Sequence, residues 1–117
     1  MLTYSIILFA LAAVFGLYLA SRVLRGELPP GAAAAIHGLL AASGLLILLY
    51  AAFVSGAPAP QTVLIAAGLL VVAALGGFVM VSFHLRRQVP PKGLAILHAL
   101  LAVGGFLTLC AGVFGNA

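Results

Sequence analysis

Four long hydrophobic runs fill almost the whole chain, and short breaks rich in proline and glycine separate them. The runs cover approximately residues 2–24, 32–54, 62–85 and 93–114. Each run reaches the roughly 20 apolar residues that a helix needs to cross a bilayer, and each is too long and too uniformly apolar for a barrel strand. The breaks "RGELPPG", "SGAPAPQ" and "RRQVPPKG" contain the residues that end and begin helices. The pattern predicts an all-α integral membrane protein, with four transmembrane helices in an up-down-up-down bundle.

Composition supports this assignment and leaves no room for a soluble domain. The 117 residues are 66% hydrophobic and 5% charged, whereas soluble domains are about 25% charged. We therefore expect one transmembrane domain over residues 1–117.

The basic residues lie on one side of the predicted membrane. They flank the first and third breaks, whereas the second break and both ends of the chain carry no charged side chain; the five are Arg22, Arg25, Arg86, Arg87 and Lys92. The positive-inside rule places these loops in the cytoplasm and both termini outside, as in a protein of the bacterial cytoplasmic (inner) membrane. We expect the net charge of +4 to face anionic lipid in the bilayer. No basic helix face or soluble module suggests a nucleic-acid partner.

The second half of the chain repeats the first half with an offset of 61 residues. "LPPGAAAAIHGLLAASGL" begins at Leu28 and "VPPKGLAILHALLAVGGF" begins at Val89. Further identities at this offset include Ala12/Ala73, Ala13/Ala74, Gly16/Gly77, Ser21/Ser82, Arg25/Arg86 and Phe53/Phe114. The units, about 1–56 and 62–117, each contain two helices and so have the same orientation. A parallel repeat of this kind predicts a pseudo-twofold axis along the membrane normal.

The repeat places a histidine at the same point of the second and fourth helices. His37 and His98 each follow a Pro-Pro pair by about two turns, or roughly 10 Å. The two helices lie diagonally across the predicted bundle, so the imidazoles should face each other near the cytoplasmic side. In both helices the pattern is H-x3-A-x2-G. These small residues either let the helix backbones approach closely or leave, at Gly44 and Gly105, a slot where a large flat group could lie. His84, near the cytoplasmic end of the third helix, has Val23 as its repeat equivalent.

Two facing imidazoles in a helical bundle suit the axial ligation of one b-type haem. Arg25 and Arg86 could then neutralise the propionates. On these residues the chain resembles small four-helix membrane cytochromes b, the class of haem-carrying anchor subunits and b561-like electron carriers. The resemblance implies haem b as cofactor, His37 and His98 as axial ligands, and electron transfer with a quinone or another redox partner. Two-haem members of that class need four histidines, and this chain has three.

Other functions remain open on the sequence alone. The chain could be a non-catalytic accessory or assembly subunit, joining a homo-oligomer or a larger membrane complex through its Ala-, Gly- and Leu-rich surface. A small transporter would lack the usual membrane-embedded carboxylate, since the sole acidic residue, Glu27, lies in a loop. A transition metal could bind three imidazoles, those of His37, His84 and His98.

No nucleophile–base pair is present and Cys110 is the only cysteine, so an electron carrier or accessory subunit is favoured over an enzyme.

Overall fold

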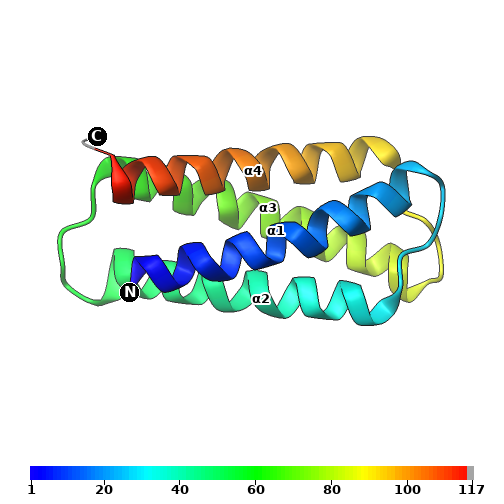
Figure 1. Ribbon diagram of the computed structural model, residues 1–117, viewed down its shortest axis with the longest axis horizontal. Helices are drawn as coiled ribbons and strands as arrows, with labels where there is room; N and C mark the ends of the chain where they lie inside the picture. The colour runs from blue at the N-terminus through cyan, green and yellow to red at the C-terminus, as the bar shows by residue number, and fades with distance from the viewer. Residues whose placement is uncertain (116–117) are drawn as a thin grey trace.

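The computed structural model describes residues 1–115 and is an all-helical bundle (Figure 1). Its long helices are α1 (Leu2–Leu24), α2 (Gly31–Leu49), α3 (Gln61–Leu85) and α4 (Lys92–Phe114), and a short π-helix, η1 (Tyr50–Val54), continues α2. With η1 counted as part of α2, each of the four is long and apolar enough to cross a membrane. The predicted four-helix fold is confirmed. With η1 counted as part of α2, every predicted helix end lies within one residue of the observed end.

Proline marks the start of three helices, because its ring fixes the backbone and its missing N–H cannot continue a preceding helix. The residues directly before the first helical position are Pro30, Pro60 and Pro91. In the α1–α2 and α3–α4 connections, α1 and α3 finish in equivalent turns, with φ of +75° at Gly26 and +56° at Arg87. The same left-handed turn is therefore made by glycine in the first unit and by arginine in the second.

The π-helical end of α2 was not predicted, and Ser55 accounts for it. The Ser55 hydroxyl donates to the carbonyl of Ala51 over 2.8 Å, which is the carbonyl that the Ser55 amide would use in an α-helix. The Ser55 amide instead donates to the carbonyl of Tyr50 over 2.9 Å, an i→i+5 bond that widens the last turn.

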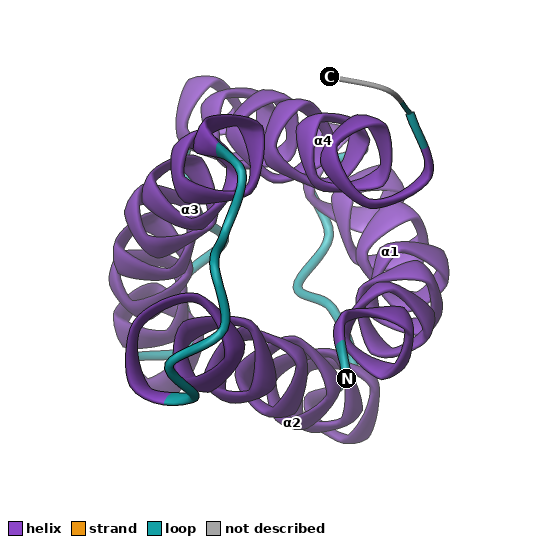
Figure 2. Cartoon of the chain, turned by 90° about the vertical axis from the view of Figure 1, so that its left-hand side faces the viewer, coloured by secondary structure: helices purple, strands orange, loops and turns teal. Residues whose placement is uncertain are grey.

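The four helices form a ring in chain order when viewed along the bundle (Figure 2). The α1–α2 and α3–α4 hairpins make the most extensive contacts, and α1 with α4 and α2 with α3 close the ring. This order leaves α2 and α4 diagonally opposed, as the sequence predicts. The main hydrophobic core lies in the half of the bundle nearest the α2–α3 connection, and its buried members are Ile6, Phe9, Leu48, Val63, Ala66, Ala67, Leu70 and Leu109.

The 61-residue repeat is also present in the packing. Leu48 and its equivalent Leu109 are both fully buried, and the equivalent prolines Pro29 and Pro90 are buried at the opposite end. Equivalent positions of the two units are therefore buried alike at both ends of the bundle.

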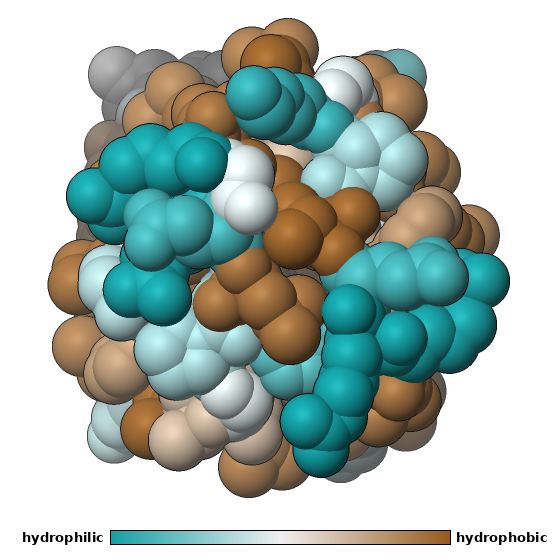
Figure 3. Space-filling view, turned by 90° about the vertical axis from the view of Figure 1, so that its right-hand side faces the viewer, coloured by the Kyte–Doolittle hydropathy of each residue, from teal (hydrophilic) through white to brown (hydrophobic). Residues whose placement is uncertain are grey.

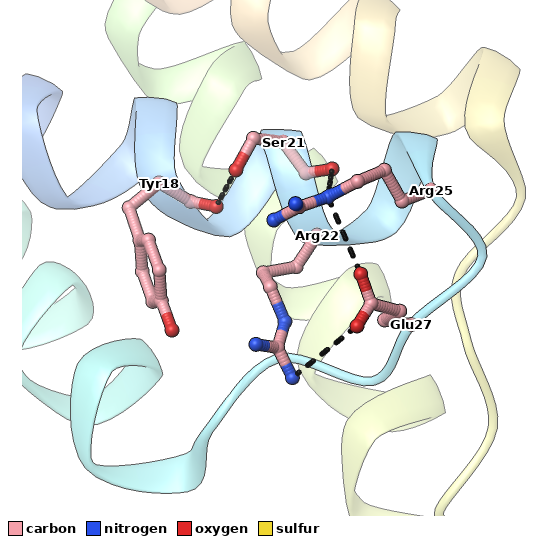
Figure 4. Close-up of polar contacts among 5 residues, drawn as sticks. All are labelled: Tyr18, Ser21, Arg22, Arg25 and Glu27. Atoms are coloured by element: carbon pink, nitrogen blue, oxygen red, sulfur yellow. Dashed lines mark hydrogen bonds and ion pairs between the residues drawn. The ribbon is translucent and has the colours of Figure 1, made fainter.

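The α1–α2 and α3–α4 connections form a common hydrophilic end of the bundle (Figure 3). Here Glu27 pairs with Arg25 over 3.3 Å and with Arg22 over 3.9 Å, and the close-up in Figure 4 shows both arginines turned toward this carboxylate. The opposite end, made by the α2–α3 connection, has no charged side chain. The structure thus gathers at one end the basic residues on which the predicted orientation rests.

Candidate functional site

His37 of α2 and His98 of α4 meet inside the bundle. Their ring centroids lie 6.2 Å apart, and the ring planes are inclined by 78°. Both side chains are half-buried. The structure brings together the two repeat-related histidines at one level between diagonal helices, the arrangement that the sequence predicts.

Each imidazole is held by a backbone carbonyl of the neighbouring helix in its own hairpin. Nδ1 of His37 donates to the carbonyl of Ala12 over 2.8 Å, and Nδ1 of His98 donates to the carbonyl of Ala73, also over 2.8 Å. A carbonyl oxygen only accepts, so Nδ1 carries the hydrogen, and Nε2 of the neutral ring keeps a free lone pair. The same device orients metal-binding histidines in many proteins.

Two glycines make this approach possible. A Cβ at Gly16 would lie 2.9 Å from Cε1 of His37, and a Cβ at Gly77 would lie 3.3 Å from Cε1 of His98. Each glycine follows its acceptor alanine by four residues, which is one helical turn, so it lies directly beside the accepting carbonyl. Ala12/Ala73 and Gly16/Gly77 are repeat matches in the sequence, and their part in holding the histidines was not predicted. The signal that could have identified them is the shared A-x3-G spacing opposite a histidine.

The histidine pair lies well inside the apolar part of the bundle. Gly16 precedes the end of α1 at Leu24 by eight residues, about 12 Å along the helix axis. Ala12 lies about 6 Å deeper still. The rings therefore lie between the charged end of the bundle and its packed core. They are nearer to the middle of α1 than the distance of His37 from the start of α2 suggests.

Gly44 and Gly105 do not provide the expected slot beside the imidazoles. A Cβ on Gly44 would meet Phe9 at 3.3 Å and Leu8 at 3.4 Å. A Cβ on Gly105 would meet the equivalent residues of α3, Leu70 at 2.8 Å and Leu69 at 3.2 Å. Both glycines are buried, and they serve close packing within each hairpin, the usual use of small residues between membrane helices. The residues that show bare backbone beside the rings are Gly16, Gly76 and Gly77.

Arg25 and Arg86 are engaged at the helix ends. Each Nε donates to the serine carbonyl one turn earlier, that of Ser21 at 3.2 Å and that of Ser82 at 3.1 Å. Arg25 also pairs with Glu27, and the Arg86 guanidinium lies 4.8 Å from the ring centre of Phe83. Since Arg25 follows Gly16 by nine residues, about 13 Å along the helix, a ligand group would have to reach toward the charged end to meet it.

His84 does not join the other two histidines. Its Nε2 lies 3.6 Å from where a Cβ on Gly31 would be, beside the first turn of α2. His37 is six residues further along α2, about 9 Å deeper. Among residues 1–115 no three His, Cys, Asp or Glu side chains are close enough to hold a metal ion. The three-imidazole metal site is therefore not formed, because the offset between His84 and the pair is too large.

Both Nε2 atoms remain available to a ligand. Within the described part of the chain neither atom has a hydrogen-bond partner. Neither is fully enclosed, since the one buried side-chain nitrogen without a partner in that part is Nε of Arg22. Two imidazoles on opposite sides of one metal ion, with bonds of about 2 Å to it, place their ring centroids roughly 6 Å apart. The 6.2 Å between the centroids of His37 and His98 is close to this separation, and bare backbone of α1 and α3 lies beside the rings.

Comparison with protein-family models, with curated proteins and with solved structures found no match to this chain.

Proposed function

We propose that this chain is a membrane electron-transfer protein, or a subunit of one, that binds a single b-type haem between α2 and α4. His37 and His98 would hold the haem iron. The supporting observation is the symmetric pair of Nδ1–carbonyl hydrogen bonds, which fixes both rings and leaves both Nε2 atoms free at a centroid separation of 6.2 Å.

The chain's own residues supply orientation and surroundings. The carbonyls of Ala12 and Ala73 hold the ring tautomers, and a hydrogen bond of this kind raises the basicity of the opposite nitrogen toward a metal. Gly16, Gly76 and Gly77 keep side chains away from the flanks of the pair. The haem, when bound, supplies a reversible one-electron change at iron, and the apolar helices around it exclude water.

A haem at this depth needs a partner for its electron. The hydrocarbon core is about 30 Å thick, and one redox centre in its interior does not span it. A quinone dissolved in the bilayer or a second membrane subunit is the partner class that we propose. The five basic residues at one end orient this exchange, with the charged loops in the cytoplasm of a bacterial cell and both termini outside.

A second function is supported by the same hydrogen bonds. Each imidazole ties two helices of a hairpin together, so the histidines could serve only to stabilise an accessory subunit of a larger membrane complex. The apolar side chains exposed on all four helices suit association with other membrane helices. In this alternative the free Nε2 atoms have no ligand.

A reduced-minus-oxidised absorption spectrum of the purified full chain tests the proposal. We expect the spectrum of a low-spin haem with two nitrogen ligands and a content of one haem per chain, either as purified or after haemin is added. A folded protein that stays colourless and does not bind added haemin contradicts the haem proposal and favours the accessory subunit.

A further inference from the structure

A shallow apolar groove runs between α1 and α4 near the charged end of the bundle. Its volume is about 130 Å³, and it is lined by Ala20, Leu24, Ala95, Ile96, Ala99 and Leu100. The groove exists because three of these residues are alanines, whose side chains are too short to fill the space between the helices. Three of its lining residues, Leu24, Ile96 and Leu100, are exposed, so the groove is open at the surface that faces lipid in a membrane-spanning bundle.

Lys92 lies on the groove's face of α4, one turn before the first α4 residue that lines it. It is the first residue of α4, and Ala95, Ile96 and Ala99 follow it at i+3, i+4 and i+7, the spacing of one helix face. Lys92 is exposed. Glu27 is the only acidic side chain in the sequence, and within residues 1–115 its ion pairs are with Arg22 and Arg25. The Lys92 ammonium therefore has no carboxylate partner in the described structure.

The repeat shows that the combination of an apolar groove and a lysine occurs on one side of the bundle. The equivalent seam lies between α3 and α2, where Gly31 stands in place of Lys92 and Gly38 in place of Ala99. There the first turn of α2 contacts His84 and carries no lysine. The two seams are related by the repeat and differ in charge at this position, so a charged ligand would distinguish them.

We propose that the α1–α4 groove binds one anionic phospholipid, with its phosphate on Lys92 and the first part of an acyl chain between the alanines. Any lipid tail can occupy an apolar groove in a bilayer, so the headgroup decides which lipid is retained. A lysine at the membrane surface attracts anionic headgroups, and its flexible stem lets the ammonium reach the phosphate level while its methylenes stay on the apolar surface. This binding does not depend on the haem proposal.

Lipid retention by the full chain in detergent, measured by native mass spectrometry with phosphatidylglycerol or phosphatidylcholine added, tests the proposal. We expect wild-type protein to retain one phosphatidylglycerol in preference to phosphatidylcholine. Lys92→Gln should weaken phosphatidylglycerol retention about fivefold, the factor that one basic side chain contributes near an anionic surface, and Lys92→Arg should preserve it. Arg87→Gln is the matched control, because it removes the same charge at the same end of the bundle away from the groove.

The groove itself is tested by Ala99→Phe, which fills it from the lipid side. We expect this variant to lose phosphatidylglycerol retention, and Val72→Phe, on the exposed face of α3, to keep it. Equal retention of the two lipids by wild-type protein, or an equal effect of Lys92→Gln and Arg87→Gln, would overturn the proposal in favour of diffuse surface attraction. An Ala99→Phe variant that retains the lipid as wild-type protein does would also overturn it. A thermal unfolding curve for each variant separates lost binding from lost folding.

Discussion

The imidazole of His37 occupies the space that a side chain at residue 16 would need, and Gly16 leaves that space open. A Cβ there would lie 2.9 Å from Cε1 of His37, closer than carbon atoms in contact normally approach. The second unit repeats the relationship between Gly77 and His98 at 3.3 Å. The glycine and the histidine therefore form one structural unit with the alanine carbonyl that accepts the hydrogen bond.

Gly16→Ala should destabilise the protein. The added methyl group forces the His37 ring away from the Ala12 carbonyl, and overpacking of this kind costs about 1–3 kcal/mol. The gain in helix propensity, about 0.5–1 kcal/mol, offsets only part of that cost. We expect a lower midpoint of thermal unfolding in detergent, with Gly77→Ala showing a smaller effect because its contact is longer.

Gly68→Ala is the matched control for that comparison. A Cβ at Gly68 meets nothing within 4 Å, so this variant should be as stable as wild-type protein or slightly more stable. A Gly16→Ala variant that unfolds at the same temperature as Gly68→Ala would contradict the role assigned to Gly16.

Replacement of either paired histidine should abolish the low-spin haem spectrum. Six-coordinate iron with two imidazoles needs both, so His37→Ala and His98→Ala should each remove the low-spin signal in electron paramagnetic resonance and absorption spectra. His84→Ala should preserve it, because His84 lies beside Gly31, away from the pair. Loss of the signal in His84→Ala alone would move the site to α3.

Neighbouring glycines on α4 should respond in opposite ways to alanine. A Cβ at Gly105 would lie 2.8 Å from Cγ of Leu70 and 3.2 Å from Cβ of Leu69, whereas a Cβ at Gly104 meets nothing within 4 Å. Gly105→Ala should therefore cost about 1–3 kcal/mol, and Gly104→Ala should cost nothing measurable. Reversible unfolding in mixed detergent measures both. Equal stability of the two variants would show that the α3–α4 hairpin is packed more loosely than the structure indicates.

Arg87→Gly should stabilise the turn after α3. Arg87 has a φ of +56°, in the left-handed region that costs a residue with a side chain about 1 kcal/mol or more. Glycine removes this cost, so the free energy of unfolding should rise by about 1 kcal/mol. Gly26→Ala, at the equivalent turn of the first unit with a φ of +75°, should lower it by a similar amount. A rise in both variants would be inconsistent with this explanation.

Single-cysteine labelling in intact cells should report the orientation. In a Cys110→Ala background, Ala57→Cys in the α2–α3 connection should react with a membrane-impermeant thiol reagent added outside. Gln88→Cys in the α3–α4 connection should react only after the membrane is opened. We base this expectation on the position of all five basic residues at the end of the bundle formed by the α1–α2 and α3–α4 connections. The reverse labelling pattern would show the opposite topology.

Most of the fold follows from the sequence because two strong signals agree. The apolar runs set the helix lengths, and Pro30, Pro60 and Pro91 set the starts of α2, α3 and α4. The repeat then places His37 and His98 at one level without any knowledge of side-chain positions. These features depend only on helix geometry and on which residues end helices.

The details of the site were less predictable because small residues are ambiguous. Gly44 and Gly16 both lie on helix faces that could line a slot, and the sequence alone does not say which one faces a ring. The structure shows that Gly44 packs against Phe9 and Leu8 and that Gly16 packs against His37. The π-turn at Tyr50 depends on one serine hydroxyl competing for a carbonyl, a local choice that hydrophobic periodicity does not record.

The hydrogen bonds from His37 to Ala12 and from His98 to Ala73 are each internal to one hairpin. Each half of the chain can therefore orient its own ring during insertion, before it meets the other half. Docking of the two hairpins then brings two already oriented imidazoles together, with their centroids 6.2 Å apart, at little further ordering cost. A ligand bound between the two rings would increase the affinity of the two hairpins for each other. Ligand binding can therefore be measured as the association of separately expressed hairpins 1–56 and 57–117.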